Sequence, residues 1–360
     1  MLALMFAAVA AGLSPPVVPG DRIAWLGGTL VEQEIRSGDW EFEIARAFPG
    51  GKIIIRNLGW SGDTLLGEAR AGFGSPAEGF KALVSQTMAM KPTVIWLQYG
   101  TNEAFAESLD IKEFRSRYER LLDALSPSKA RFVLVIPPPV ESRPSPLPDP
   151  GAVNGRLARI ADEIRSLAAS KGCSVVSLEK LWEGSPAGQT TNGLQMTPGG
   201  YQSTAAAFAK ALGLASTTPT PLEVANDGKE TIDKFLPSPG NPRLVRTTGL
   251  GQGSHELLIN GEAVASADAA AWKEGVMVSK GAPWAQAASL REKIVAKNMQ
   301  FFHRWRPQNE TYLFGFRKHE QGNNAREIPQ FDPFIEKAEA EIDRLSVPAS
   351  VRYQIRKVSS

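Results

Sequence analysis

Five short apolar segments alternate with amphipathic helical segments between residues 21 and about 214, and this alternation constrains the fold more than any other feature. Strands that are buried on both faces read as nearly continuous apolar runs, and strands separated by helices pair in parallel. The sequence therefore predicts a flavodoxin-like three-layer α/β/α sandwich. Its five parallel strands are expected at residues 22–27, 52–58, 93–99, 131–136 and 174–178.

The pattern changes after residue 214, which indicates a C-terminal extension. Residues 215–221 are rich in Thr and Pro and are typical of a linker. Leu257, Leu258 and Ile259 precede Asn260-Gly261, a dipeptide that favours a tight hairpin. We predict a β-rich unit over 222–282 and a helical tail or lid over 283–360, with helices at 284–304 and 332–345.

The N-terminal 14 residues are apolar and end in small residues. This run is too short to span a bilayer but suits the core of a signal peptide, although no basic residue precedes it. We therefore expect residues 1–20 to be a signal peptide or leader and the protein to be secreted or periplasmic; a packed or disordered leader is the alternative. Elsewhere the sequence predicts no transmembrane segment.

The charge balance of the chain and its few cysteine and histidine residues argue against several function classes. The chain has 40 basic and 38 acidic residues without a basic stripe, which argues against a nucleic-acid partner. Cys173 is the single cysteine, so no internal disulfide can form, and we expect a buried thiol. The 3 histidines form no close-spaced ligand pair, so we predict neither a metal site nor a cofactor.

Glycine and polar residues follow four of the five predicted strands. Ligands of open parallel sheets bind at the carboxyl ends of the strands, which makes these segments candidate site residues. Each segment alone is also typical of a turn or a helix cap. In chain order they are Gly27-Gly28-Thr29, Asn57-Leu58-Gly59, Gly100-Thr101-Asn102 and Asn192-Gly193-Leu194-Gln195.

Taken together, these four segments over residues 21–214 resemble the sequence blocks of the SGNH (GDSL-like) hydrolases. The resemblance implies hydrolysis of acyl esters, plausibly O-acetyl esters on carbohydrate, with a small-molecule or carbohydrate ester as the partner. It places Thr29 at the nucleophilic serine and assigns Gly59 and Asn102 to the oxyanion hole. It also places Asn192 at the triad aspartate and Gln195 at the triad histidine.

These replacements predict that conventional catalysis is impaired. The Thr29 hydroxyl survives, although its β-methyl group crowds the line of attack. The amide of Gln195 cannot take up a proton near neutral pH. Removing the base of a serine protease lowers kcat by about 2 × 10⁶. The alternative hypothesis is a non-catalytic protein that binds an acylated glycan or a protein partner in the inherited pocket.

Two further groups of residues lie outside the four segments. Residues 301–320 are dense in aromatic and polar side chains, a mixture that suits a lid, a carbohydrate-stacking surface or simple packing of the extension. Within this region, His303 or His319 is a possible replacement base. We interpret Asp63 and Glu103, which neighbour the predicted site, as carboxylates that brace loops.

Overall fold

The computed structural model describes residues 14–197, 199–215, 219–307 and 309–358. Its central sheet contains five parallel strands in the order β2-β1-β3-β4-β5. The predicted α/β fold is therefore confirmed. The strands are β1 (Arg22–Gly27), β2 (Ile54–Asn57), β3 (Val94–Gln98), β4 (Arg131–Ile136) and β5 (Ser174–Ser177).

Helices cover both faces of this sheet because successive strand residues point to opposite sides. In β1, Ile23 and Trp25 face one core, whereas Ala24 and Leu26 face the other. The first core includes residues of α1 (Thr29–Ser37), α2 (Asp39–Ala47) and α6 (Gly200–Ala211). The second includes residues of α3 (Pro76–Ala89), α4 (Ile111–Leu125) and α5 (Gly151–Lys171), and it contains the buried Cys173.

The described end of the expected leader is part of the folded domain. Val17 is buried, and the indole nitrogen of Trp96 in β3 donates to the carbonyl oxygen of Pro16 at 3.0 Å. Ser174 and Arg131 also donate to backbone carbonyls of this segment. Residues 14–17 therefore contact the α/β domain, while the leader boundary at residue 20 stays a prediction. Residues 1–13, on which the signal-peptide prediction rests, lie outside the described residues.

The extension begins with two small sheets. One has the order β11-β8-β6 and the other the order β10-β9-β12-β7. Asn260 and Gly261 have φ angles of 52° and 88° at the β9–β10 turn, as the hairpin prediction requires. The elements are β6 (Leu222–Glu223), β7 (Thr231–Lys234), β8 (Arg243–Arg246), β9 (Ser254–Ile259), β10 (Glu262–Asp268), α7 (Ala269–Glu274), β11 (Val276–Val278) and β12 (Ser350–Lys357).

One prediction for the tail is wrong. Residues 283–360 are not helical to their end, because β12 inserts between β7 and β9 as an inner strand of the larger sheet. Its alternating burial, with Val351, Tyr353 and Ile355 buried, matches a strand that packs on one face. The chain therefore leaves the β-rich unit and returns to it.

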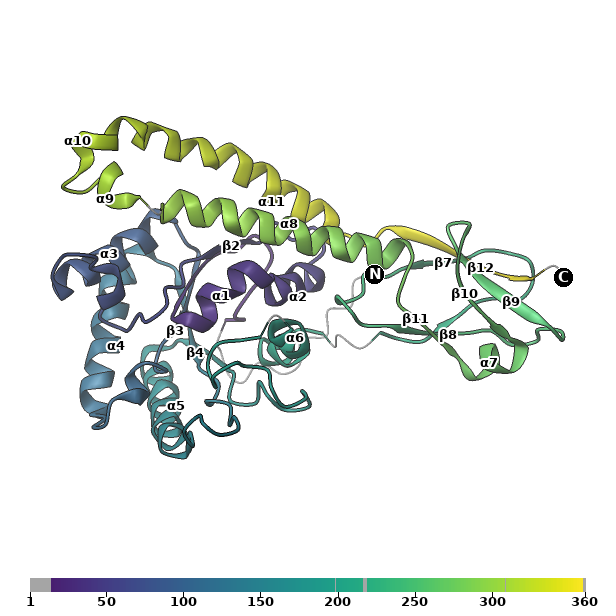
Figure 1. Ribbon diagram of the computed structural model, residues 1–360, viewed down its shortest axis with the longest axis horizontal. Helices are drawn as coiled ribbons and strands as arrows, with labels where there is room; N and C mark the ends of the chain where they lie inside the picture. Colours follow the sequence, from purple (N-terminus) through teal and green to yellow (C-terminus); the bar gives the residue numbers. More distant parts are fainter. Residues whose placement is uncertain (1–13, 198, 216–218, 308, 359–360) are drawn as a thin grey trace.

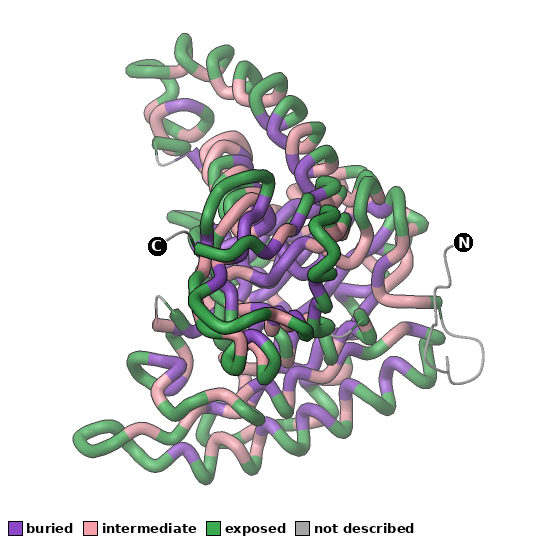
Figure 2. Tube along the Cα trace, turned by 90° about the vertical axis from the view of Figure 1, so that its right-hand side faces the viewer, coloured by how far each residue is buried: buried purple, intermediate pink, exposed green. Residues whose placement is uncertain are grey.

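Between the departure and the return, α8 (Ala282–Trp305) and α11 (Asp332–Ser346) form an antiparallel helical hairpin along the α/β domain (Figure 1). Helix α8 contacts α1, α2 and β2. Figure 2 shows buried residues concentrated inside, while the outer faces of the helices are exposed. Short helices join the hairpin at its far end: α9 (Glu310–Leu313), α10 (Lys318–Gln321) and η4 (Gly322–Phe331). Within the described ranges, no helix is long and apolar enough to cross a membrane.

Candidate active site

A cavity opens at the carboxyl edge of the parallel sheet, where the sequence places the site. Its wall combines residues that follow β1, β2, β3 and β4 with the loop between β5 and α6. Residues from distant parts of the chain meet there because parallel strands end at the same edge. The wall consists of Gly28, Thr29, Leu30, Asp63, Gln98, Tyr99, Gly100, Thr101, Asn102, Glu103, Pro138, Pro139, Trp182, Gly193 and Leu194.

Thr29 is the first residue of α1 and lies in the cavity wall. Gly28 precedes it as the N-cap residue, so Thr29 does not cap the helix. The N–H groups of Val31 and Glu32 both donate to the Gly28 carbonyl at 3.1 Å. Those of Thr29 and Leu30 lie at the helix N-terminus, which attracts negative charge. Both residues line the cavity, so the start of α1 brings a hydroxyl group and two backbone N–H groups to its wall.

Asn102 meets the start of α1 from the other side. Its side-chain nitrogen lies 3.5 Å from the position that a Cβ atom on Gly28 would occupy. The same nitrogen donates to the backbone carbonyl of Asp63 at 2.5 Å. A primary amide has two N–H donors, so one remains for a ligand. The structure thus brings Thr29 and Asn102 together in one wall.

Gly59 does not reach this wall. Its N–H donates to the side-chain oxygen of Asn57 at 2.9 Å, and the side-chain nitrogen of Asn57 donates to the carbonyl of Val31 at 2.7 Å. The N–H is therefore not free for an oxyanion, and the role expected for Gly59 needs correction. A Cβ atom here would lie 2.3 Å from the backbone nitrogen of Glu32, so close passage of α1 explains the glycine.

The last segment contributes its middle residues to the wall rather than its outer ones. Gly193 and Leu194 line the cavity, whereas Asn192 and Gln195 are exposed and lie outside the lining. The side-chain oxygen of Asn192 accepts from the N–H groups of Leu194 at 3.1 Å and Gln195 at 2.8 Å. Asn192 thus shapes its own turn and does not orient a base.

Glu141 holds this last loop in place, and the sequence analysis missed it. Its carboxylate accepts from the N–H groups of Gly188 at 2.7 Å, Gln189 at 3.0 Å and Thr190 at 2.7 Å, and from the Thr190 hydroxyl at 2.6 Å. Burial favours a higher pKa for Glu141, but these hydrogen bonds outweigh it and lower the pKa. Its partners are more than 40 residues away along the chain, so no local pattern reveals the role.

Neither candidate replacement base comes to the cavity. The His303 ring packs against Phe302 and Phe331, with ring centroids 5.7 and 6.3 Å apart. The His319 side chain is 74% exposed and lies beside Glu320. Among the residues that the structure describes, no histidine lines the cavity. The hypothesis of a histidine supplied by the tail therefore needs correction, because packing and the position of α10 keep both rings away.

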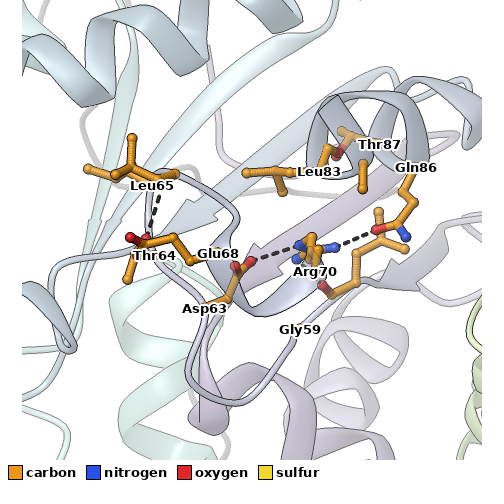
Figure 3. A network of polar contacts seen from close by, with 12 residues as sticks. Gly59, Asp63, Thr64, Leu65, Glu68, Arg70, Leu83, Gln86 and Thr87 are labelled. Carbon is orange, nitrogen blue, oxygen red and sulfur yellow. Dashed lines mark hydrogen bonds and ion pairs between the residues drawn. The ribbon is translucent and has the colours of Figure 1, made fainter. Parts of the chain in front are cut away.

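Asp63 and Glu103 both brace loops, as predicted. Asp63 accepts from Nε of Arg70 at 2.8 Å (Figure 3). It also accepts from the Tyr99 hydroxyl at 3.2 Å. Glu103 accepts from the N–H groups of Leu65 at 3.1 Å and Gly100 at 2.9 Å. Burial raises the pKa of both carboxyl groups. At Asp63, the charge of Arg70 is the largest effect that opposes this rise in pKa.

Two acceptors in the wall lack a protein partner. Oδ1 of Asp63 and Oε1 of Gln98 are buried and accept no hydrogen bond within the described part of the chain. Both atoms are shielded from solvent, so they lie behind the surface that a ligand in the cavity would contact. Apolar groups supply much of the remaining wall: Leu30, Pro138, Pro139, Trp182 and Leu194. Across the described ranges, no three His, Cys, Asp or Glu side chains are grouped so as to hold a metal ion.

The α/β/α architecture and the cavity at its carboxyl edge are those of the ester-hydrolase class that the sequence resembles. The model of the GDSL-like lipase/acylhydrolase family matches residues 20–203. The chain belongs to this family.

One solved structure of high TM-score agrees on the fold, and two of lower TM-score are also similar in part. A gut microbial diltiazem-metabolizing enzyme is 15% identical, with a TM-score of 0.69, and the match covers 97% of this chain and 100% of the other. A GDSL-like lipase from Bacteroides thetaiotaomicron is 16% identical over 56% of this chain and 91% of its own, with a TM-score of 0.38. An acetylxylan esterase from Geobacillus stearothermophilus, solved as a catalytic mutant, is 15% identical over 56% and 97%, with a TM-score of 0.40. A comparison with curated protein sequences gives no match.

Proposed function

We propose that this protein binds a small acyl ester at the start of α1 and hydrolyses it far more slowly than a GDSL-type enzyme with an intact triad. One observation carries the proposal: Thr29 lies in a cavity whose described wall contains oxyanion donors but no imidazole. Among the described residues, the wall supplies donors for a carbonyl oxygen. It supplies no base that would remove the proton from the Thr29 hydroxyl.

The binding half follows from the donors around Thr29. A carbonyl oxygen placed against the first turn of α1 would accept from backbone N–H groups and from the free amide hydrogen of Asn102. Fixed donors of this kind each contribute about 2.7–4 kcal/mol to the transition state in related reactions. The same donors also hold an unreacted ester, so the cavity is suited to binding even where turnover is slow.

The activating half has no substitute among the neighbouring carboxylates. Asp63 is paired with Arg70 and Tyr99, and Glu103 accepts two backbone N–H groups. Attack by the Thr29 hydroxyl on the ester carbonyl therefore has to release its proton to water. Without a positioned base, the reaction loses most of the rate that general-base catalysis supplies.

A carbohydrate ester fits the rest of the wall. The Trp182 ring, whose indole nitrogen donates to the carbonyl of Pro139 at 2.8 Å, offers an apolar face for a sugar ring. This apolar face supports an O-acetylated sugar as the class of ligand.

Removing the Thr29 hydroxyl tests this proposal in the full-length chain. We expect the natural chain to hydrolyse p-nitrophenyl acetate slowly and Thr29→Ala to lower that hydrolysis to the rate of buffer. Thr29→Ser is the matched variant and should stay within about tenfold of the natural chain, because it removes the crowding β-methyl group but adds no base. Hydrolysis by Thr29→Ala equal to that of the natural chain would contradict the proposal.

A non-catalytic binding protein is the second candidate, because the donors at the start of α1 and on Asn102 can hold an ester without cleaving it. It predicts that an acetylated xylo-oligosaccharide raises the melting temperature of the natural chain without being consumed, because a ligand that binds only the folded state stabilises it. The deacetylated oligosaccharide is the matched control. Release of acetate during the same incubation would instead favour the slow hydrolase.

A further inference from the structure

We propose that Arg306, a residue of the C-terminal extension, is a positioning residue for the loop of residues 58–63, hereafter the β2 loop. The guanidinium carbon of Arg306 lies 3.4 Å from the ring centroid of Trp60, in the middle of this loop. Trp305 meets the same ring edge-on, with centroids 5.8 Å apart. The end of α8 thus covers the β2 loop with one cation and one aromatic ring.

A second set of contacts joins the same arginine to α1. Arg306 donates to Oε1 of Glu32 at 2.5 Å. The other carboxylate oxygen of Glu32 accepts from the N–H of Ser61 at 2.7 Å and from the Ser61 hydroxyl. Glu32 belongs to the first turn of α1, which begins at Thr29. Arg306 therefore contacts both the β2 loop and the helix that carries the proposed nucleophile.

Hydrogen bonds of the β2 loop connect Trp60 to Asn102, the proposed oxyanion donor. The N–H of Asp63 donates to the carbonyl of Trp60 at 2.9 Å, and the carbonyl of Asp63 accepts from the Asn102 side chain. On the inner side, Arg70 stacks on Trp60 at 5.4 Å and pairs with the carboxylate of Asp63. If Trp60 moves, the Asp63 carbonyl loses its position, and the Asn102 amide with it.

Exchange of backbone amides tests the structural part of this inference in full-length protein. The N–H groups of Gly59, Trp60, Ser61 and Asp63 are all hydrogen-bonded, so hydrogen–deuterium exchange reports on the β2 loop. We expect Arg306→Ala to speed exchange there about tenfold. Arg304→Ala is the matched control and should leave it unchanged, because Arg304 pairs with Asp332 inside the extension at 2.7 Å. Unchanged exchange in Arg306→Ala overturns the inference.

The consequence for the site rests on the proposed function and is measured separately. In the natural chain, we expect Arg306→Ala to lower kcat for the Thr29-dependent hydrolysis of p-nitrophenyl acetate about tenfold, while Arg304→Ala leaves it within twofold. Arg306→Lys should give an intermediate kcat, because lysine keeps the charge beside Glu32 but lacks the planar group that stacks on Trp60. An Arg306→Ala kcat equal to that of Arg304→Ala overturns the positioning role. Hydrolysis by the natural chain that does not depend on Thr29 contradicts the proposed function alone, since the exchange experiment does not depend on turnover.

Discussion

At Gly59 the β2 loop passes the first turn of α1 so closely that a Cβ atom would lie 2.8 Å from the Cα of Glu32. Both neighbouring N–H groups hold the loop there, since Leu58 donates to the Trp25 carbonyl at 2.8 Å and Trp60 to the Gly27 carbonyl at 2.9 Å. The chain therefore cannot move aside without breaking hydrogen bonds to β1. At this position the absence of a side chain serves packing rather than catalysis.

We expect Gly59→Ala to lower the free energy of unfolding by about 3 kcal/mol, because an overpacked site costs about 1–3 kcal/mol and here the opposing atoms are backbone. Urea unfolding of the full chain measures this change. Gly155→Ala is the control, since Gly155 lies in α5 with no atom within 4 Å of the added Cβ. That control should be neutral or stabilising by about 0.5–1 kcal/mol. Equal stability of the two variants would contradict the packing role of Gly59.

At the scale of elements, the α8–α11 hairpin docks on the α/β domain through buried charges. Lys297 in α8 is 1% exposed; its ammonium group donates to Oε1 of Glu41 at 2.6 Å and to the Ile55 carbonyl at 3.1 Å. Asn298 donates to the other oxygen of Glu41 at 2.9 Å. A charge buried in this way needs its partner, so these contacts determine the position at which α8 can lie against α2.

Replacing Lys297 should loosen this docking. Lys297→Met leaves the carboxylate of Glu41 buried without its counter-ion, and breaking such a pair costs about 3–5 kcal/mol. Lys297→Met/Glu41→Gln should regain most of that loss, because replacing a whole buried ion pair is often neutral. Denaturant unfolding of the natural chain, of Lys297→Met and Glu41→Gln alone and of the double variant provides the comparison. A double variant as unstable as the sum of the single changes would exclude the coupling.

At the scale of the whole molecule, the chain from α8 to β12 joins the β-rich unit, the α8–α11 hairpin and the α/β domain. The polypeptide leaves the β-rich unit through α8, crosses the α/β domain, returns through α11 and ends as an inner strand of the larger sheet. Arg56 in β2 pairs with Glu339 in α11, and the Lys52 N–H donates to the Asp343 carboxylate at 2.7 Å. Both helices of the hairpin thus contact the domain that carries the site.

Stability of the whole chain should depend on pH through Glu34, a buried residue of α1. Burial and the nearby charge of Glu41 raise the pKa of Glu34 to about 8. The folded protein therefore holds a proton that the unfolded chain releases above an ordinary pKa of about 4.3. The linked stability is fully present below that ordinary pKa and is lost as pH rises towards 8.

The variant Glu34→Gln keeps an acceptor for the N–H groups of Trp40 and Glu41 but cannot ionise. We expect it to exceed the natural chain by at least about 1 kcal/mol at pH 8.5, the equivalent of one pKa unit, and to match it near pH 4.5. Chemical unfolding across this pH range tests the difference. Glu183→Gln, at a side chain 62% exposed, is the control and should change little. A difference independent of pH would refute the linkage.

The sequence alone determined the parts of this protein that local patterns encode. The apolar runs predicted the five strands, Asn260-Gly261 predicted the hairpin, and the order of parallel strands placed Thr29 and Asn102 at one edge. Only the tertiary structure decided that Gly59 faces α1, that β12 enters the sheet, that both tail histidines lie away from the cavity, and that Arg306 covers Trp60. Arg306 and Glu32 are 274 residues apart, and a contact over that separation depends on how helices pack and not on any periodicity in the chain.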